Sequence, residues 1–204
     1  MNKLFYFVGL LFIANIVFTA CGSSRTADAG VEINGIRWAT RNVDAPGTFA
    51  PTPESSGMLY QWNRNIGWSS SNPMVNSEGG NTWNSSVPTG TSWARENDPC
   101  PEGWRVPTQA ELQSLVNAGS IWTTRNEVRG LLFGTAPNQI FLPAAGSRDD
   151  EDGTIDGLGI EGSYWSSEQR VSESAWGLFF SIIDETEVDW ELRTVAQSVR
   201  CVAE

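Results

Sequence analysis

The stretch that decides the fold is residues 98–119, DPCPEGWRVPTQAELQSLVNAG. Its second half predicts an α-helix, because Thr108 and Glu111 match a capping box, in which each side chain accepts a hydrogen bond from the other's backbone N–H. Three apolar residues then follow at helical spacing. The helix is therefore expected over residues 108–118, with Gly119 as its end.

Short segments on both sides of this helix predict β-strands. Residues 31–38 alternate around Asn34-Gly35, which favours two strands joined by a tight turn. In residues 187–192, Val188, Trp190 and Leu192 alternate with acidic residues, the pattern of a strand with one buried face. Further strands are expected at residues 57–62, 128–133, 139–142, 164–166, 175–183 and 198–202.

The N-terminus predicts an exported lipoprotein. Lys3 is followed by the apolar residues 4–18 and by small residues before Cys21, a pattern that resembles the lipobox of bacterial lipoproteins. An uncleaved anchor helix is the alternative. We expect a signal peptide at residues 1–20, a flexible tether at 21–30 and one domain at 31–204. Lipid on Cys21 would attach the protein to a membrane, which is therefore its first expected partner. We expect this to be an outer membrane, and exposure at the cell surface is compatible with that location.

Charge and cysteine content narrow the function classes. The chain has 24 acidic residues, 13 basic residues and no His, so nucleic acid is not expected as a partner and histidine-based catalytic relays are excluded. With Cys21 assigned to lipid, Cys100 and Cys201 remain, in a compartment that permits disulfides. They form either one bridge or two separate buried thiols.

Four linked motifs resemble the Fibrobacter succinogenes major paralogous domain of bacterial lipoproteins and surface proteins. They are residues 98–108 (DPCPEGWRVPT), 142–146 (LPAAG), 162–167 (GSYWSS) and 198–202 (SVRCV). That family is similar to formylglycine-generating enzymes, whose fold is of the C-type lectin kind. The resemblance implies an α+β, C-type lectin-like domain with antiparallel sheets, one clear helix near 108–118 and long loops. It also implies that a Cys100–Cys201 link ties the final strand to the segment before the helix.

The same resemblance argues against catalysis. Formylglycine-generating enzymes carry a redox pair of cysteines shortly before their terminal strand, and the matching residues 184–197 contain no Cys. Cys201 instead matches the structural cysteine of that strand. We therefore expect no enzyme activity and no catalytic residues, and an enzyme of this type remains the weakest alternative.

Two groups of residues are candidates for ligand contact. The acidic loop 148–157 is a candidate calcium site, and a solvated turn is the alternative. The spacing of its acidic residues fits an EF-hand badly. Indoles stack on sugar rings, so those in the polar loop 64–94 are candidate ligand contacts, although they could equally cap the core. Four other tryptophans, in motif or strand positions, are expected in the core. The candidate calcium ligands are Asp149, Asp150, Asp152 and Asp156, the candidate contact residues are Trp68, Trp83 and Trp93, and the expected core residues are Trp104, Trp165, Trp176 and Trp190.

These observations predict a non-catalytic lipoprotein of the cell envelope that binds a glycan or a surface protein and needs no cofactor, with calcium as the one candidate ion. The alternative is a structural or accessory subunit of a fimbria-like surface assembly.

Overall fold

The predicted helix forms where the capping box places it. In the computed structural model, which describes residues 27–183 and 185–204, helix α1 spans Gln109–Asn117. The backbone N–H of Glu111 donates to Oγ1 of Thr108 at 3.2 Å, and the backbone N–H of Thr108 donates to Oε2 of Glu111 at 2.7 Å. Gly119 follows with φ of +77°, a conformation that glycine adopts without strain. The predicted helix and its cap are confirmed.

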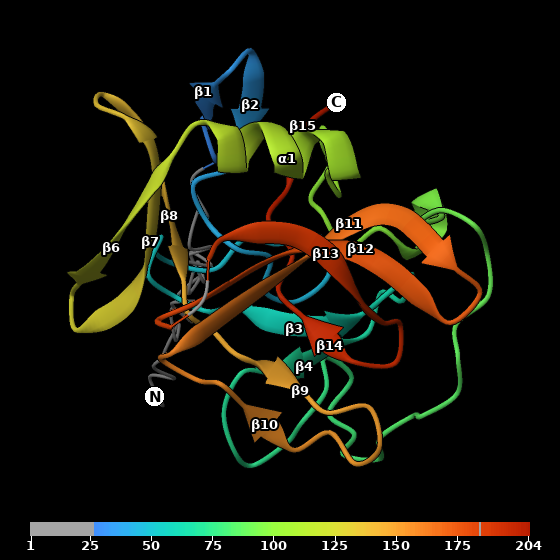
Figure 1. The fold of residues 1–204 in the computed structure, drawn as a ribbon. Coiled ribbons are helices and arrows are strands. Elements are labelled where there is room, and N and C mark those ends of the chain that lie inside the picture. Colours follow the sequence, from blue (N-terminus) through green and yellow to red (C-terminus); the bar gives the residue numbers. More distant parts are fainter. Residues whose placement is uncertain (1–26, 184) are drawn as a thin grey trace, which may run out of the picture.

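The strands form four sheets, with α1 at one side of the molecule (Figure 1), and every pair of neighbouring strands within the sheets is antiparallel. The described residues thus form an α+β fold that is mostly β, as expected. A 3-10 helix, η1, spans Arg95–Asn97. The first sheet has the strand order β1 (Val31–Ile33), β2 (Ile36–Trp38), β15 (Val202–Ala203) and β5 (Trp104–Arg105), and the second has β10 (Ile155–Asp156), β9 (Ser147–Arg148), β14 (Ala196–Gln197), β3 (Met58–Gln61) and β4 (Gly67–Ser69). The third sheet consists of β11 (Glu161–Val171), β12 (Ser174–Ser181) and β13 (Glu187–Leu192). The fourth sheet consists of β6 (Ser120–Arg125), β7 (Val128–Thr135) and β8 (Asn138–Pro143).

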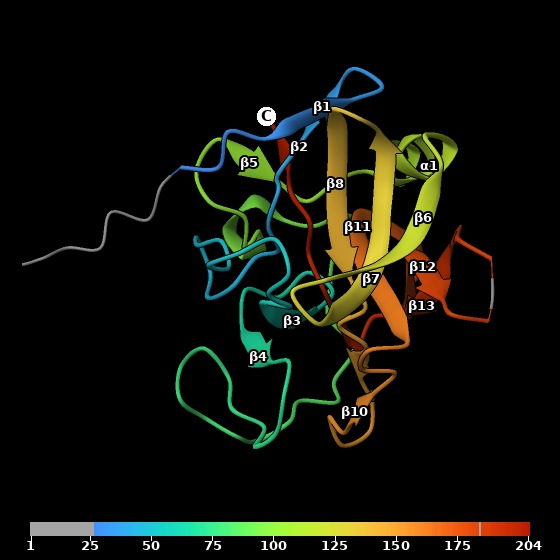
Figure 2. The same ribbon diagram turned by 90° about the vertical axis from the view of Figure 1, so that its left-hand side faces the viewer.

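The main core lies between α1, the β11–β12–β13 sheet and the β6–β7–β8 sheet (Figures 1 and 2). Leu112 and Leu115 of α1 pack in one cluster with Tyr164 of β11, Leu178 of β12 and Phe133 of β7. These side chains are buried because the helical and strand periods each place apolar residues on a single face. The opposite face of the β11–β12–β13 sheet also contributes to the core, because Trp165 of β11 and Ala175 of β12 pack in a second buried cluster.

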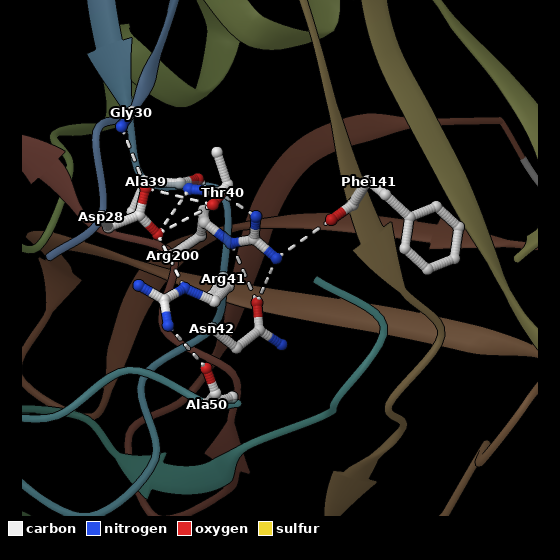
Figure 3. Close-up of polar contacts among 9 residues, drawn as sticks. All are labelled: Asp28, Gly30, Ala39, Thr40, Arg41, Asn42, Ala50, Phe141 and Arg200. Atoms are coloured by element: carbon white, nitrogen blue, oxygen red, sulfur yellow. Dashed lines mark hydrogen bonds and ion pairs between the residues drawn. The ribbon is translucent and has the colours of Figure 1, made fainter. Parts of the chain in front are cut away.

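The predicted N-terminal hairpin is confirmed, and the folded region begins before it. β1 and β2 pair around Asn34 and Gly35, whose φ values of +52° and +78° are those of a tight hairpin turn. The tether was expected to extend to residue 30, yet Asp28 already accepts hydrogen bonds from the backbone N–H groups of Gly30 and Thr40 at 2.9 and 3.0 Å. Asp28 also pairs with Nε of Arg41 at 3.2 Å (Figure 3). Residues 28–30 therefore belong to the domain.

Three buried arginines hold loop carbonyl groups in place. Arg148 donates to the carbonyls of Ser69, Ser71 and Gly153, and Arg193 to those of Ser172, Thr89 and Gly90. Arg200 is the third. A guanidinium presents five N–H donors in a fixed plane, whereas an ammonium is a point charge with three. This use of the planar fork gives a physical reason for arginine at these three positions in a chain whose only lysine is Lys3.

Buried hydrogen bonds and the disulfide link residues of all four sequence motifs, and Figure 3 shows the part of this network around Arg200. Arg200 donates to Oδ1 of Asn42 at 2.7 Å, and Nδ2 of Asn42 donates to the hydroxyl of Tyr164 at 3.3 Å. Tyr164 donates in turn to the carbonyl of Pro143 at 2.8 Å. Cys201, which follows Arg200, is bonded to Cys100, so the predicted bridge is confirmed. Tyr164, Arg200 and Cys201 of these motifs are therefore buried parts of the fold.

The structure departs from the sequence analysis at three places. Of the strand expected at residues 198–202, only Val202 lies in a strand, β15. Residues 120–125 form β6, which the sequence analysis did not predict. Trp190 was expected in the core but is 43 % exposed, because it lies near the end of the sheet beside Trp176, with which it pairs across β12 and β13. The guanidinium of Arg170 lies 4.6 Å from the Trp190 ring centre. The ring thus packs against a cation at the surface.

Candidate functional site

An open pocket of about 260 Å³ lies on the face of the β11–β12–β13 sheet that does not contact α1. Strand alternation puts most of its residues on that face. Glu161 pairs with Ser181, Ser163 pairs with Phe179, and Phe179 pairs with Glu187 on the other side. Residues paired directly across strands point to the same side of a sheet. The lining residues are Ser147 of β9, Glu161, Gly162 and Ser163 of β11, Phe179, Phe180 and Ser181 of β12, Glu187 and Glu191 of β13, Gln197 of β14, and Glu185.

The pocket is acidic and partly aromatic. Glu187 and Glu191 lie four residues apart on β13 and so project from the same face, and Glu161 lies across the sheet from them on β11. Within the described residues, none of these three carboxylates takes part in an ion pair. The ring of Phe179 lies between them in the strand order. The site therefore combines uncompensated negative charge with an apolar surface.

Gln197 is the unusual member of this pocket. Its residue is 0 % exposed, and both Nε2 and Oε1 of its side chain lack a hydrogen-bond partner in the described part of the chain. The backbone fixes its position, because β14 pairs with β3, where Gln197 lies opposite Tyr60. Buried polar side chains nearly always have a partner, and leaving one without costs about 1–3 kcal/mol. The amide is therefore enclosed at the wall of the pocket and makes no hydrogen bond in the described part of the chain.

Glu191 is the most perturbed carboxyl group in the pocket. Burial raises its pKa, and the charges of Asp150 and Asp189 raise it further, while the backbone N–H of Leu192, which donates to Oε1 at 2.7 Å, opposes the change. The charged form of Glu191 is therefore held at an energetic cost. A positive group in the pocket would offset that cost.

The three loop tryptophans pack into the domain. Trp68 and Trp93 are buried, and Trp93 donates from Nε1 to the carbonyl of Asn97 at 2.8 Å. Trp83 is half-buried, lies 4.9 Å from Trp68 between ring centres, and donates from Nε1 to the carbonyl of Asp150 at 3.0 Å. Trp68 and Trp93 therefore belong to the core, which was the alternative to a role in ligand contact. Trp83 is the one ring of the three with a substantial exposed part.

Trp83→Ala is expected to lower the free energy of unfolding by about 2 kcal/mol, because it removes the ring that packs on Trp68 and the hydrogen bond to Asp150. Chemical denaturation of the variant and the wild type measures the difference. An unchanged free energy of unfolding together with loss of ligand binding would show that Trp83 serves a ligand and not the fold.

The acidic turn uses its carboxylates locally. Oδ1 of Asp149 accepts from the backbone N–H of Glu151, Oδ1 of Asp152 from that of Thr154, and Oδ1 of Asp156 from that of Gly157. Asp150 contributes its carbonyl to Trp83. Over residues 27–183 and 185–204, no three His, Cys, Asp or Glu side chains are grouped so that they could hold a metal ion. Calcium binding by Asp149, Asp150, Asp152 and Asp156 stays a prediction.

The signal peptide, the lipidation site Cys21 and most of the tether lie outside the described residues. No helix among the residues that are described has the length and hydropathy of a membrane span.

Comparison with known proteins does not add a relative. A scan of protein-family models, a search of curated proteins and a search of solved structures each returned no match to this chain. The family resemblance described above therefore stays a prediction, and the functional argument depends on the pocket itself.

The sequence analysis missed the pocket because its residues come from five strands between residues 147 and 197, and their proximity depends on how these strands pair and pack. Glu187 and Glu191 have the ordinary pattern of a solvated strand face, and Gln197 lies in a short apolar segment before the terminal motif. One signal was present: Gln197 comes directly before the terminal motif, where a polar side chain that becomes buried needs a partner.

Proposed function

We propose that this chain is a non-catalytic binding module of the bacterial cell envelope, of C-type lectin-like fold, anchored to an outer membrane through lipid on Cys21. Its ligand occupies the acidic pocket on the face of the β11–β12–β13 sheet that does not contact α1. The lipobox-like sequence before Cys21 supports the anchor, and the motif resemblance supports the fold. A binding role accounts for a pocket that holds polar groups the fold does not use.

The single observation that carries this proposal is the unpartnered amide of Gln197. A side chain with one acceptor and two donors, enclosed on the wall of a pocket of about 260 Å³, destabilises the free protein. Such a cost is common where a protein keeps polar groups ready for a ligand. The ligand would supply the missing hydrogen bonds and so recover the cost on binding.

Gln197→Met is expected to abolish ligand binding, because methionine has a similar length but cannot hydrogen-bond as an amide does. The detergent-solubilised protein, wild type and variant, is applied to a glycan array and to a peptide array. Gln113→Met on the exposed surface of α1 is the matched control and should bind as the wild type does. Array signals that are equal for the wild type and Gln197→Met would contradict the proposal that the pocket binds the ligand.

The anchor makes a separate prediction. Mass spectrometry of the membrane fraction should find Cys21 as the N-terminal residue with acyl groups attached, and Cys21→Ala should yield an unprocessed or soluble protein. An unmodified Cys21 thiol in the membrane-bound wild type would refute the anchor without affecting the pocket.

A further inference from the structure

We infer that a second binding site lies on the α1-facing side of the β11–β12–β13 sheet, and that it takes a glycan whose sugar rings carry a carboxylate group. The site consists of Trp176, Trp190 and Arg170, which we call the aromatic platform. It is separate from the acidic pocket and goes beyond the proposed function.

The first step is the exposed indole surface. Trp176 of β12 lies directly opposite Trp190 of β13, so both side chains project from the same face of the sheet. Trp190 is 43 % exposed and Trp176 is partly exposed. Among the residues that the structure describes, Trp190 is the only tryptophan that counts as exposed. The exposed indole that the sequence analysis expected in the loop 64–94 is therefore found on this sheet, where its ring offers a surface on which a sugar ring can stack.

The second step is the cation beside these rings. The guanidinium carbon of Arg170 lies 4.6 Å from the ring centre of Trp190 and 6.0 Å from that of Trp176. Over residues 27–183 and 185–204, Arg170 takes part in no ion pair and no hydrogen bond. Contact with a ring uses the positive charge but leaves the five N–H donors of the guanidinium unused. Arg170 is therefore an exposed cation without an anion.

The acidic residues next to the platform in the sequence do not supply that anion. Oε2 of Glu168 accepts a hydrogen bond from the backbone N–H of Gln109 at 2.8 Å, at the start of α1. Asp189 and Glu191 flank Trp190 along β13, so they project from the opposite face of the sheet. The chain as a whole has a net charge of −11, but charges farther away than about 8 Å are largely screened at physiological salt. The local charge at the platform is therefore positive.

The third step is the ligand that fits both features. A carboxylate matches the planar guanidinium through two parallel hydrogen bonds. In a hexuronic acid the carboxylate is attached directly to the sugar ring, so a single sugar residue brings an apolar C–H face and a negative charge to neighbouring positions. Phosphate or another small anion would leave the indoles uncovered, and a neutral sugar would leave Arg170 without a counter-charge.

The test titrates the detergent-solubilised protein with trisaccharides of glucuronic, galacturonic and mannuronic acid by calorimetry. Each trisaccharide is also used as its methyl ester, which keeps the sugar and removes the charge. We expect at least one acid to bind at least about tenfold more tightly than its ester, because hydrogen bonds between charged groups are stronger than those of a neutral ester.

Two variants separate the charge from the stacking surface. Arg170→Gln should reduce the affinity for the acid to that for the ester, a loss of about tenfold. Trp190→Ala should weaken the acid and the ester by the same factor, since it removes the ring and keeps the charge. The matched controls are Arg129→Gln on β7 and Ile121→Ala on β6, both exposed, and they should bind as the wild type does. Thermal unfolding shows whether each variant is folded.

Gln197→Met separates this inference from the proposed function, because the pocket and the platform lie on opposite faces of the sheet. The variant should bind the acidic trisaccharide as the wild type does. Loss of other ligands from the arrays in Gln197→Met concerns the pocket alone, and equal array signals would contradict the proposed function while the platform stands.

Three results would overturn the inference. Equal binding of acid and ester for all three sugars would exclude recognition of the carboxylate. Acid-specific binding that survives Arg170→Gln, or that is lost in Gln197→Met, would place the site elsewhere. Absence of binding by every trisaccharide, with a lower melting temperature for Arg170→Gln or without one, would show that the platform is not a glycan site.

Discussion

Removing the Cys100–Cys201 bridge is expected to lower the free energy of unfolding by up to about 4.7 kcal/mol. The two residues are 101 positions apart, and the chain-entropy model assigns that value to a loop of about 100 residues. The bridge ties the residue before β15 to the segment before β5, and Cys201 is buried with Val106 and Val199. Loss of the bridge gives the unfolded chain more conformations, and the larger entropy of the unfolded state lowers the free energy of unfolding.

The measurement compares the wild type with the double variant Cys100→Ala, Cys201→Ala by thermal unfolding. Alanine avoids placing a new hydroxyl group in the core. At roughly 2–4 °C per kcal/mol for a domain of this size, the melting temperature should fall by about 10–15 °C. Reduction of the unfolded wild type, followed by refolding in reductant, should reproduce the fall. A double variant that melts with the wild type would contradict the expected contribution of the bridge.

Arg200→Met is expected to destabilise the domain by about 3–5 kcal/mol. Burial lowers the pKa of Arg200 to about 10, so at neutral pH the guanidinium is still charged. It donates to Oδ1 of Asn42 and to the carbonyls of Ala39 and Phe141, at 2.7 to 3.1 Å. Methionine would leave these buried acceptors without donors, and each one costs about 1–3 kcal/mol.

Two comparisons sharpen this prediction. Arg129→Met, on an exposed part of β7, changes the same side chain at the surface and should alter the free energy of unfolding by less than about 0.5 kcal/mol. Asn42→Ala should cost less when combined with Arg200→Met than alone, because the two side chains share one network. Urea unfolding of the wild type and the four variants measures these differences. Equal stabilities of Arg200→Met and Arg129→Met would show that the network does not hold the core.

Local patterns in the sequence were sufficient for the elements whose signals are local. The capping box placed α1, and the Asn34-Gly35 pair placed the first hairpin, because both depend on residues within a few positions of each other. β6 was missed because its connection to β7 lacks such a local signal. It turns into β7 through Asn126 and Glu127, which have φ values of +45° and +68° without a glycine, so the usual hairpin signal is not there.

Contacts between residues far apart in the sequence determine the features that local patterns did not predict. Alternation predicted one buried face for β13, and Val188 does pack against the core, yet Trp190 on the same face is exposed near the sheet's end. The motifs predicted a family and a disulfide, but only the fold shows that Arg200, Tyr164 and Pro143 meet. The pocket joins Gln197 to Glu161 and Glu187, and no local pattern relates these three positions.

The most direct test of the central claim, that Gln197 is held ready for a ligand, is the melting temperature of ligand-free Gln197→Met. Removing an unpartnered buried amide should raise the free energy of unfolding by about 1–3 kcal/mol and the melting temperature by several degrees. Gln113→Met, the exposed control on α1, should melt as the wild type does. A melting temperature for Gln197→Met below that of the wild type would mean that the amide stabilises the fold, and it would contradict the account.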